Sequence, residues 1–217
     1  MIITQQKGFD EIIKHLKSGS KVFIVGCGEC STVCQAGGEK EVLDMKKKLQ
    51  DSGYIVVGYA IPQAPCIATH VKLMLVKHKK EIENTDEILV LTCGLGVQSL
   101  IENMKCFIPV HVGCNTLFIG TVDSGAKEFF EVCSACGDCT LEYTAGICAY
   151  TQCPKSILNG PCGGMEGGMC EVDKEKDCVW VLIYNKLKEQ GRLDLMEKIY
   201  PAKDFSKHRK PLRRILK

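Results

Sequence analysis

Apolar and polar positions in the first 125 residues follow two spacings. Short runs rich in β-branched residues predict buried strands at residues 21–26, 54–58, 87–92, 107–112 and 117–122. Between them, apolar residues recur every three or four positions, which predicts helices at residues 9–16, 42–49, 67–81 and 97–104. Strands that alternate with helices favour parallel pairing through right-handed crossovers. The predicted fold class is therefore α/β, beginning with a small doubly wound parallel sheet.

Cysteine follows each of the first four predicted strands. The four positions, in chain order, are Cys27, Cys66, Cys93 and Cys114. The carboxyl ends of parallel strands form the edge at which such sheets bind their ligands. Scattered structural cysteines are not expected to occupy the same end of every strand, so this arrangement predicts a binding site at that edge.

The pattern changes after residue 125. Eight of the 15 cysteines lie between Cys133 and Cys178, together with seven glycines, and long periodic segments are absent. These features predict a loop-rich metal-binding domain that folds around its ligands. Apolar spacing over residues 180–187 predicts a C-terminal helix. We therefore expect an α/β domain at 1–125, a cysteine-rich domain at 126–200 and a basic tail at 201–217.

What the many cysteines indicate depends on the cellular compartment, because the compartment determines whether thiols stay reduced. The first residues lack the apolar segment of a secretory leader, and no apolar run is long enough to span a bilayer, so we expect a cytoplasmic protein. Thiols in the cytosol are normally kept reduced, which favours metal binding or catalysis over disulfides. Hydrophobic residues make up 45% of the 217, enough to build a core without disulfide support.

The net charge of +2 conceals an asymmetry between the tail and the rest of the chain. Residues 201–217 contain seven Lys or Arg and one acid, which leaves the first 200 residues with a net charge of −4. A basic arm suits nucleic acid, a membrane surface or an acidic partner protein, and a solvated tail is the other interpretation. Phe205 is the only aromatic residue between Lys203 and the C-terminus, so nucleic-acid binding is disfavoured.

The first cysteine motif follows the first strand. Its members are Cys27, Cys30 and Cys34. Three thiolates on a glycine-containing loop can hold one face of an iron–sulfur cluster, with a fourth ligand from elsewhere. Cys93 is the expected fourth ligand because first and third strands are often neighbours, and Cys66 and Cys114 are the alternatives. A zinc site or free thiols is the other interpretation, although zinc sites more often use separated cysteine pairs.

The second motif resembles the start of the bacterial ferredoxin run. Its members are Cys133, Cys136 and Cys139. The Cys-Pro that would end the run occurs at Cys153, displaced along the chain, and Cys148 lies between. The spacing favours at least one cluster in this segment. A four-cysteine zinc site, or one cluster with one zinc, is the alternative.

The third group has wider spacing. Its members are Cys153, Cys162, Cys170 and Cys178, separated by Gly-Pro and Gly-Gly turns. Four thiolates complete either a tetrahedral zinc site or a 4Fe-4S cluster, and both remain open here. His70 and His111 are substitute ligands, although histidines satisfied within the protein are the more common case. Cys106 is left as a plain buried thiol.

Other catalytic patterns are absent. The glycines at 26–28 and 94–96 lack the third glycine of a dinucleotide fingerprint, and the chain has neither a Walker A pattern nor paired carboxylates. We therefore expect no catalytic residue and no direct nucleotide site. Many cysteines with few other reactive groups suit electron relay, in which the cofactor supplies the chemistry.

The C-terminal motifs closely resemble the methylenetetrahydrofolate reductase C-terminal domain family. The resemblance is carried by Cys153-Pro-Lys-Ser-Ile-Leu-Asn-Gly-Pro-Cys162-Gly-Gly, Cys170-Glu-Val-Asp and Cys178-Val-Trp-Val-Leu-Ile-Tyr. That family is a cysteine-rich module, fused to a folate reductase barrel or present as a separate small subunit. With the motifs at residues 27–30 and 63–66, the resemblance covers nearly the whole chain. Over that length, the chain resembles the small iron–sulfur subunits of acetogenic bacteria.

The resemblance implies a partner: an FMN-containing barrel subunit that reduces 5,10-methylene-tetrahydrofolate to 5-methyl-tetrahydrofolate in the methyl branch of the Wood–Ljungdahl pathway. This chain would be the non-folate-binding subunit of that oxidoreductase, not catalytic alone, relaying electrons through two or three 4Fe-4S clusters. Further redox subunits are additional partners. The family also implies zinc for the C-terminal cysteines, so a zinc-stabilised assembly subunit without a redox role is the alternative.

Overall fold

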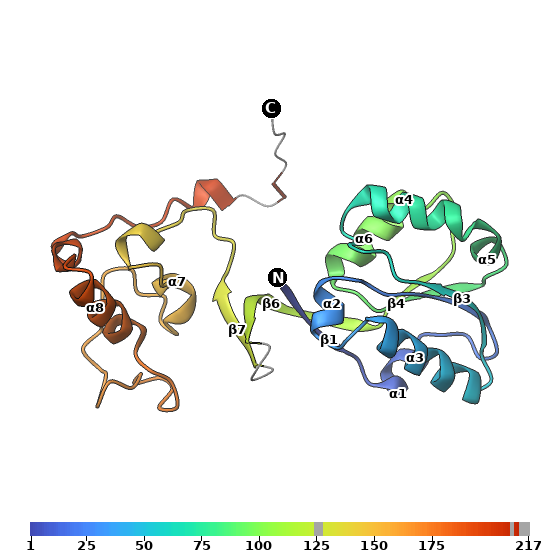
Figure 1. Ribbon diagram of the computed structural model, residues 1–217, viewed down its shortest axis with the longest axis horizontal. Coiled ribbons are helices and arrows are strands. Elements are labelled where there is room, and N and C mark those ends of the chain that lie inside the picture. Colours follow the sequence, from blue (N-terminus) through green and yellow to red (C-terminus); the bar gives the residue numbers. More distant parts are fainter. Residues whose placement is uncertain (124–127, 209–210, 213–217) are drawn as a thin grey trace. The chain divides into compact units, whose positions relative to one another are not determined.

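The computed structural model describes residues 1–123, 128–208 and 211–212. The chain divides into two compact units, Met1–Phe118 and Ile119–Lys217. Figure 1 labels the helices and strands of both units. Within the described ranges, no helix has the length and apolar character needed to cross a membrane.

A four-stranded parallel sheet forms the centre of the first unit. Its strands are β2 (Lys21–Val25), β3 (Ile55–Ala60), β4 (Glu87–Val90) and β5 (Val110–Val112). Their order is β3-β2-β4-β5, and each neighbouring pair is parallel. The expectation that the first and third predicted strands are neighbours is confirmed, since Phe23 of β2 pairs with Ile88 of β4.

Helices cover both faces of this sheet, as a doubly wound arrangement requires. They are α1 (Phe9–Ile13), α2 (Cys30–Val33), α3 (Glu39–Asp51), α4 (Ala68–Lys77), α5 (Lys79–Glu83) and α6 (Gly94–Asn103). Val22 and Ile24 of β2 pack with α1 and α3 on one face, whereas Phe23 and Val25 pack with α4 and α6 on the other (Figure 1). All four side chains are buried, because a strand with helices on both faces exposes neither side.

A second sheet contains three strands in the order β1-β6-β7. They are β1 (Ile2–Gln6), β6 (Cys114–Asp123) and β7 (Glu128–Cys133), and β6 pairs with β7 in antiparallel fashion. The strand predicted at 117–122 is therefore confirmed as part of β6, but it belongs to this second sheet and not to the parallel one. Only Gly113 separates β5 from β6, whereas a parallel connection needs a dozen or more residues.

The second unit is built from short elements. They are η1 (Leu141–Tyr143), α7 (Ala149–Gln152), α8 (Val179–Glu189), η2 (Leu193–Glu197) and η3 (Phe205–His208). The predicted C-terminal helix is confirmed as α8, and its residues Ile183 and Leu187 are fully buried. The Trp180 indole N–H donates to the carbonyl of Ile157 at 3.1 Å. Cys153 and Cys178 belong to the same buried cluster, so this core is itself partly made of candidate ligands.

Candidate metal centres

Three loops of the first unit meet at the carboxyl ends of its strands. The Gly28 amide donates to the carbonyl of Pro62 at 3.0 Å, and the Cys27 thiol lies 4.0 Å from the carbonyl of Gln63. A Cβ at Gly28 would lie 3.1 Å from the Cα of Gln63, and a Cβ at Gly96 would lie 3.1 Å from Cγ of Pro65. Glycine at both positions therefore lets the loops that carry Cys27, Cys66 and Cys93 approach each other closely.

Four thiols gather where these loops meet. Burial raises the pKa of the Cys66 thiol, and the neighbouring sulfurs of Cys93, Cys27 and Cys30 raise it further. Mutual repulsion between thiolates of this kind is relieved by a bound cation. Cys93 also precedes the first turn of α6. The association of Cys93 with the Cys27 loop stays a prediction, and Cys66 is a further candidate for the same place.

Two further cysteines of this unit point toward backbone carbonyls. The Cys34 thiol lies 3.8 Å from the Ile2 carbonyl and the Cys114 thiol 3.5 Å from the Ala36 carbonyl. Cys114 is buried, and this burial, reinforced by nearby thiols of which Cys93 contributes most, raises its pKa to about 12. The raised pKa favours the neutral S–H form of Cys114 over the thiolate that metals require. The ligand role of Cys34 and Cys114 stays a prediction.

One small cavity in the second unit is lined by the whole third cysteine group. The four are Cys153, Cys162, Cys170 and Cys178. Met165, Val179 and Trp180 line the same cavity, so its wall is largely apolar. Residues 162–178 are folded back by backbone bonds between Cys178 N and Gly168 O (2.8 Å) and between Cys170 N and Lys176 O (2.8 Å). Four cysteines that are spread over 26 residues of the sequence thereby line one cavity.

Polar side chains also reach this cavity. The Cys162 thiol donates to Oε1 of Glu171 at 3.4 Å, and Lys155 forms an ion pair with the same carboxylate. Cys178 precedes the first turn of α8, an 11-residue helix. The cavity therefore combines sulfur ligands with nearby groups of both charges.

The second cysteine group forms a separate cluster of contacts. The sulfur of Cys133 accepts from the Ala135 amide at 3.4 Å. Cys148 donates to Oγ1 of Thr151 at 3.5 Å, and that hydroxyl donates in turn to Oγ of Ser134 at 3.4 Å. Cys148 thus lies beside the 133–139 loop, whereas Cys153 lines the other cavity. This packing favours Cys148 over Cys153 as the partner of the 133–139 loop, and the grouping of ligands stays a prediction.

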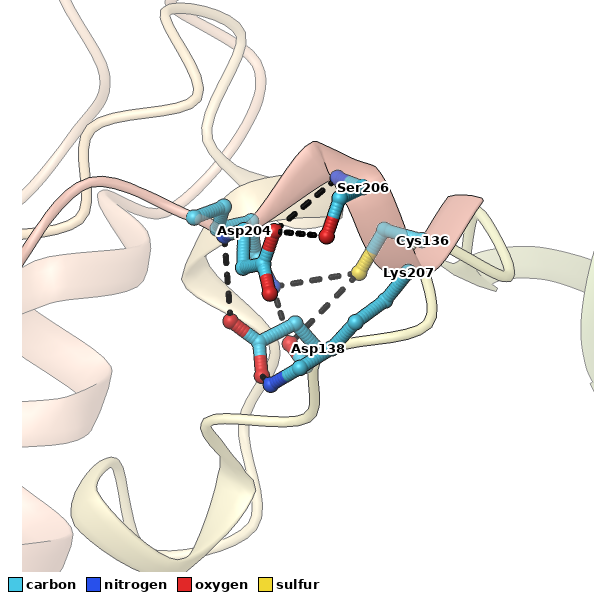
Figure 2. A network of polar contacts seen from close by, with 6 residues as sticks. Cys136, Asp138, Asp204, Ser206 and Lys207 are labelled. Atoms are coloured by element: carbon cyan, nitrogen blue, oxygen red, sulfur yellow. Dashed lines mark hydrogen bonds and ion pairs between the residues drawn. The ribbon is translucent and has the colours of Figure 1, made fainter. Parts of the chain in front are cut away.

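Cys136 has a charged neighbour from the C-terminal arm. Nζ of Lys203 lies 3.1 Å from the Cys136 sulfur. Burial raises the pKa of the Cys136 thiol, but contacts with the Asp138 backbone and with Lys203 outweigh that effect and hold it below its ordinary value. Figure 2 shows Asp138, Asp204, Ser206 and Lys207 in the same network. In a count of charges, Lys203 is simply one of several cations near the C-terminus. In the sequence, only Asp138 within the motif indicates that a cation of this arm contacts the 133–139 loop.

The donor set fits iron–sulfur clusters or zinc, since soft thiolates favour both. Across residues 1–123, 128–208 and 211–212, no three Cys, His, Asp or Glu side chains are arranged to hold one metal ion. A cluster contains several metal atoms and sulfides, so its protein ligands lie farther apart than those of a single ion.

The two histidines considered as substitute ligands differ in their contacts. Nδ1 of His70 accepts from the Ala64 amide at 3.1 Å. Nε2 of His111 is buried and lies 3.3 Å from a carboxylate oxygen of Glu87, without a hydrogen-bond partner among the described residues. The expectation that Cys106 is a buried thiol is wrong, because its side chain is exposed. Strand β5 begins only at Val110, so Cys106 lies before the sheet and not within it.

Comparison with known proteins bears on the second unit. Residues 111–206 match the family model for the methylene-tetrahydrofolate reductase C terminal. This match supports a relationship to methylenetetrahydrofolate reductases, a group of oxidoreductases. The matched range contains both cysteine groups of the second unit and excludes the thiols at 27–93. No curated protein and no solved structure matches the chain.

Proposed function

We propose that this chain is the iron–sulfur electron-transfer and assembly subunit of a flavin-dependent 5,10-methylene-tetrahydrofolate reductase, acting in the methyl branch of the Wood–Ljungdahl pathway. The observation that carries the proposal is the division of the eight cysteines between 133 and 178 into two groups of four. One group lines a cavity with Trp180. In the other, Cys133, Cys136 and Cys139 share one loop, and Cys148 contacts that loop through the Thr151 and Ser134 hydroxyls. Both lie within the residues that match the reductase family.

The chain's own residues suit a relay more than a catalyst. When bound, a 4Fe-4S cluster accepts and donates single electrons. The thiols would supply its ligands, and buried apolar neighbours such as Val179 and Trp180 would limit the access of water, which influences the potential of a bound cluster. The described residues contain a four-stranded sheet and no eight-stranded barrel, so folate and FMN are assigned to a cytoplasmic barrel partner, with other redox subunits as further partners.

A third centre is proposed at the sheet edge of the first unit. Its ligands are Cys27, Cys30, Cys66 and Cys93, supported by the close loop contacts at Gly28 and Gly96. This set differs from the grouping that the sequence favours by replacing Cys34 with Cys66. Cys34 and Cys114 face backbone carbonyls instead.

Zinc is the second candidate for the cavity that Cys153, Cys162, Cys170 and Cys178 line, because four thiolates complete a tetrahedral site. The four side chains would have to move closer together for this, since no three of them are arranged around a single ion in the described residues. A protein with zinc there and no iron elsewhere would be a non-redox assembly subunit.

Metal and sulfide analysis with EPR on anaerobically purified protein separates these functions. The relay predicts iron with acid-labile sulfide and a cluster signal after reduction, whereas iron-free protein with stoichiometric zinc overturns it. Cys162→Ser is expected to lose metal from one site. Cys106→Ser is the matched control, because Cys106 is exposed and belongs to none of the three groups.

A further inference from the structure

The C-terminal arm, defined here as residues 201–208, does not remain free in solvent. Its first lysine, Lys203, is only 8% exposed. The Lys203 ammonium lies 3.1 Å from the Cys136 sulfur, contacts the carbonyl oxygen of Asp138, and sits 5.2 Å from the centroid of the Tyr150 ring. A sulfur, a carbonyl and an aromatic face thus surround one buried cation.

Several contacts hold the arm against the 133–139 loop. Nζ of Lys207 pairs with Oδ1 of Asp138 at 2.8 Å, and the Asp204 amide lies 3.4 Å from Oδ2 of the same carboxylate (Figure 2). The Phe205 ring lies 6.4 Å from the Tyr150 ring. Asp138 therefore receives two bonds from the arm, and its pKa is lowered mainly by the Lys207 bond.

Gly137 makes this approach feasible. Its φ of +78° lies in the left-handed region, and a Cβ there would be 3.0 Å from the Lys207 carbonyl oxygen. A larger residue would be strained in that conformation and would press against the arm. The loop that carries Cys136 and Cys139 is thus shaped to accept the arm at short range.

The burial of Lys203 calls for a specific role. Removing an ammonium from water is costly unless it finds partners, and here two hydrogen-bond acceptors and a cation–π contact with the Tyr150 ring serve that purpose. The Lys207–Asp138 pair is more exposed and resembles the surface ion pairs that contribute little to stability. A lysine that served only to attach the arm would not need its charge at a candidate ligand sulfur.

We propose that Lys203 is a positioning residue for the cysteine site that contains Cys136, donating a hydrogen bond to the ligand sulfur and raising the reduction potential of the cluster held there. The inference rests on the proposed function, because it requires a cluster at this site. Reduction adds an electron to the cluster, and a fixed positive charge beside a ligand sulfur stabilises the reduced form. Hydrogen bonds to sulfur and net charge are among the factors that set cluster potentials.

The test is EPR-monitored potentiometry on the full-length chain, purified anaerobically. Lys203→Met keeps the length and apolar stem of the side chain and removes its charge, so the midpoint potential of one cluster is expected to shift to a more negative value. Lys207→Met is the matched control, since it removes an arm charge that contacts Asp138 but not the sulfur, and the potential should stay at the wild-type value. Lys203→Arg keeps the charge, so the midpoint potential of this variant should lie close to the wild-type value.

The outcomes separate this inference from the proposed function. Wild-type protein without iron overturns the proposed function and the inference together. Wild-type protein with clusters whose potentials are unchanged in Lys203→Met overturns the role of Lys203 alone. If Lys203→Met retains no cluster, Lys203→Arg decides: loaded protein with a wild-type or slightly altered potential supports the charge-dependent role, and loss of the cluster there as well overturns it.

Discussion

The two units of this chain use cysteine differently. In the first unit, most thiols lie at the ends of strands, and the buried clusters consist mainly of aliphatic and aromatic residues such as Phe23 and Leu89, with Cys114 as their one cysteine. In the second unit, Cys153 and Cys178 are part of the core cluster, and the longest helix has only 11 residues. A metal bound to the first unit would therefore contribute little to its stability, whereas a metal bound to the second unit would be part of what keeps that unit folded.

Metal removal should give the largest contrast between the units. A chelator applied to reduced, anaerobic protein is expected to unfold the second unit, because structural metal sites supply about 10–16 kcal/mol of apparent binding free energy. Hydrogen exchange should then rise in α8 and remain slow in β2 and β4. Slow exchange in α8 after complete metal removal would contradict the comparison.

Core truncations should give a smaller and local effect. Leu89→Ala in the first unit and Leu187→Ala in the second each delete a fully buried side chain, which costs about 2–5 kcal/mol. The single tryptophan, Trp180, lies in the second unit, so its fluorescence during urea unfolding reports on that unit alone. Leu187→Ala should shift the fluorescence transition, whereas Leu89→Ala should shift only the circular dichroism change of the first unit. A shift of the fluorescence transition by Leu89→Ala would show that the units unfold together.

Ligand substitutions in the first unit should change metal content with little change in stability. Cys66→Ser is expected to remove the metal at the sheet edge, because its thiol lies among those of Cys93, Cys27 and Cys30. Cys34→Ser is the matched control, since that thiol faces the carbonyl of Ile2. Metal analysis and urea unfolding on both variants provide the measurement. Loss of metal in Cys34→Ser but not in Cys66→Ser would restore the grouping that the motif spacing favours.

The smallest expected effect is a difference in thiol reactivity. Burial raises the pKa of Cys114 to about 12, so its thiolate is scarce at neutral pH. In metal-stripped protein, alkylation of Cys114 followed by mass spectrometry should stay slow below that pH, because the first unit remains folded. An unfolded thiol ionises at a pKa of about 8.5, so this unit should lose stability as pH rises from there toward 12. Alkylation of Cys114 at pH 8 at the rate seen in urea would contradict the prediction.

The parallel sheet could be predicted because its strands are continuous apolar runs. Buried parallel strands such as β2 and β4 need apolar residues on both faces, and this leaves a clear signal in the sequence. The short β1 contains Thr4, Gln5 and Gln6, and β7 is interrupted by Glu131, so neither run is distinct. Their pairing with β6 depends on contacts between distant residues, which local patterns do not contain.

The sequence predicts which cysteines are candidate ligands, but it does not predict which of them share one centre. Spacing identifies Cys133, Cys136 and Cys139 as a unit, yet Cys148 joins them only through the Thr151 and Ser134 hydroxyls. Lys203 illustrates the same limit, since nothing in a run of tail lysines distinguishes the one that is buried. Tertiary packing decides both, because it determines which side chains share an enclosed space.

The presence of Cys153 and Cys178 in a hydrophobic core has a consequence for the life of the chain in a cell. On the proposed function, the first unit would be able to fold as it leaves the ribosome, while the second would need its cofactors to fold. Chains without cofactors would then expose α8 and its neighbours to proteases, and small losses of stability already change protein abundance several-fold. On the proposed function, the supply of iron and sulfide would thus set how many subunits survive as well as how many are active.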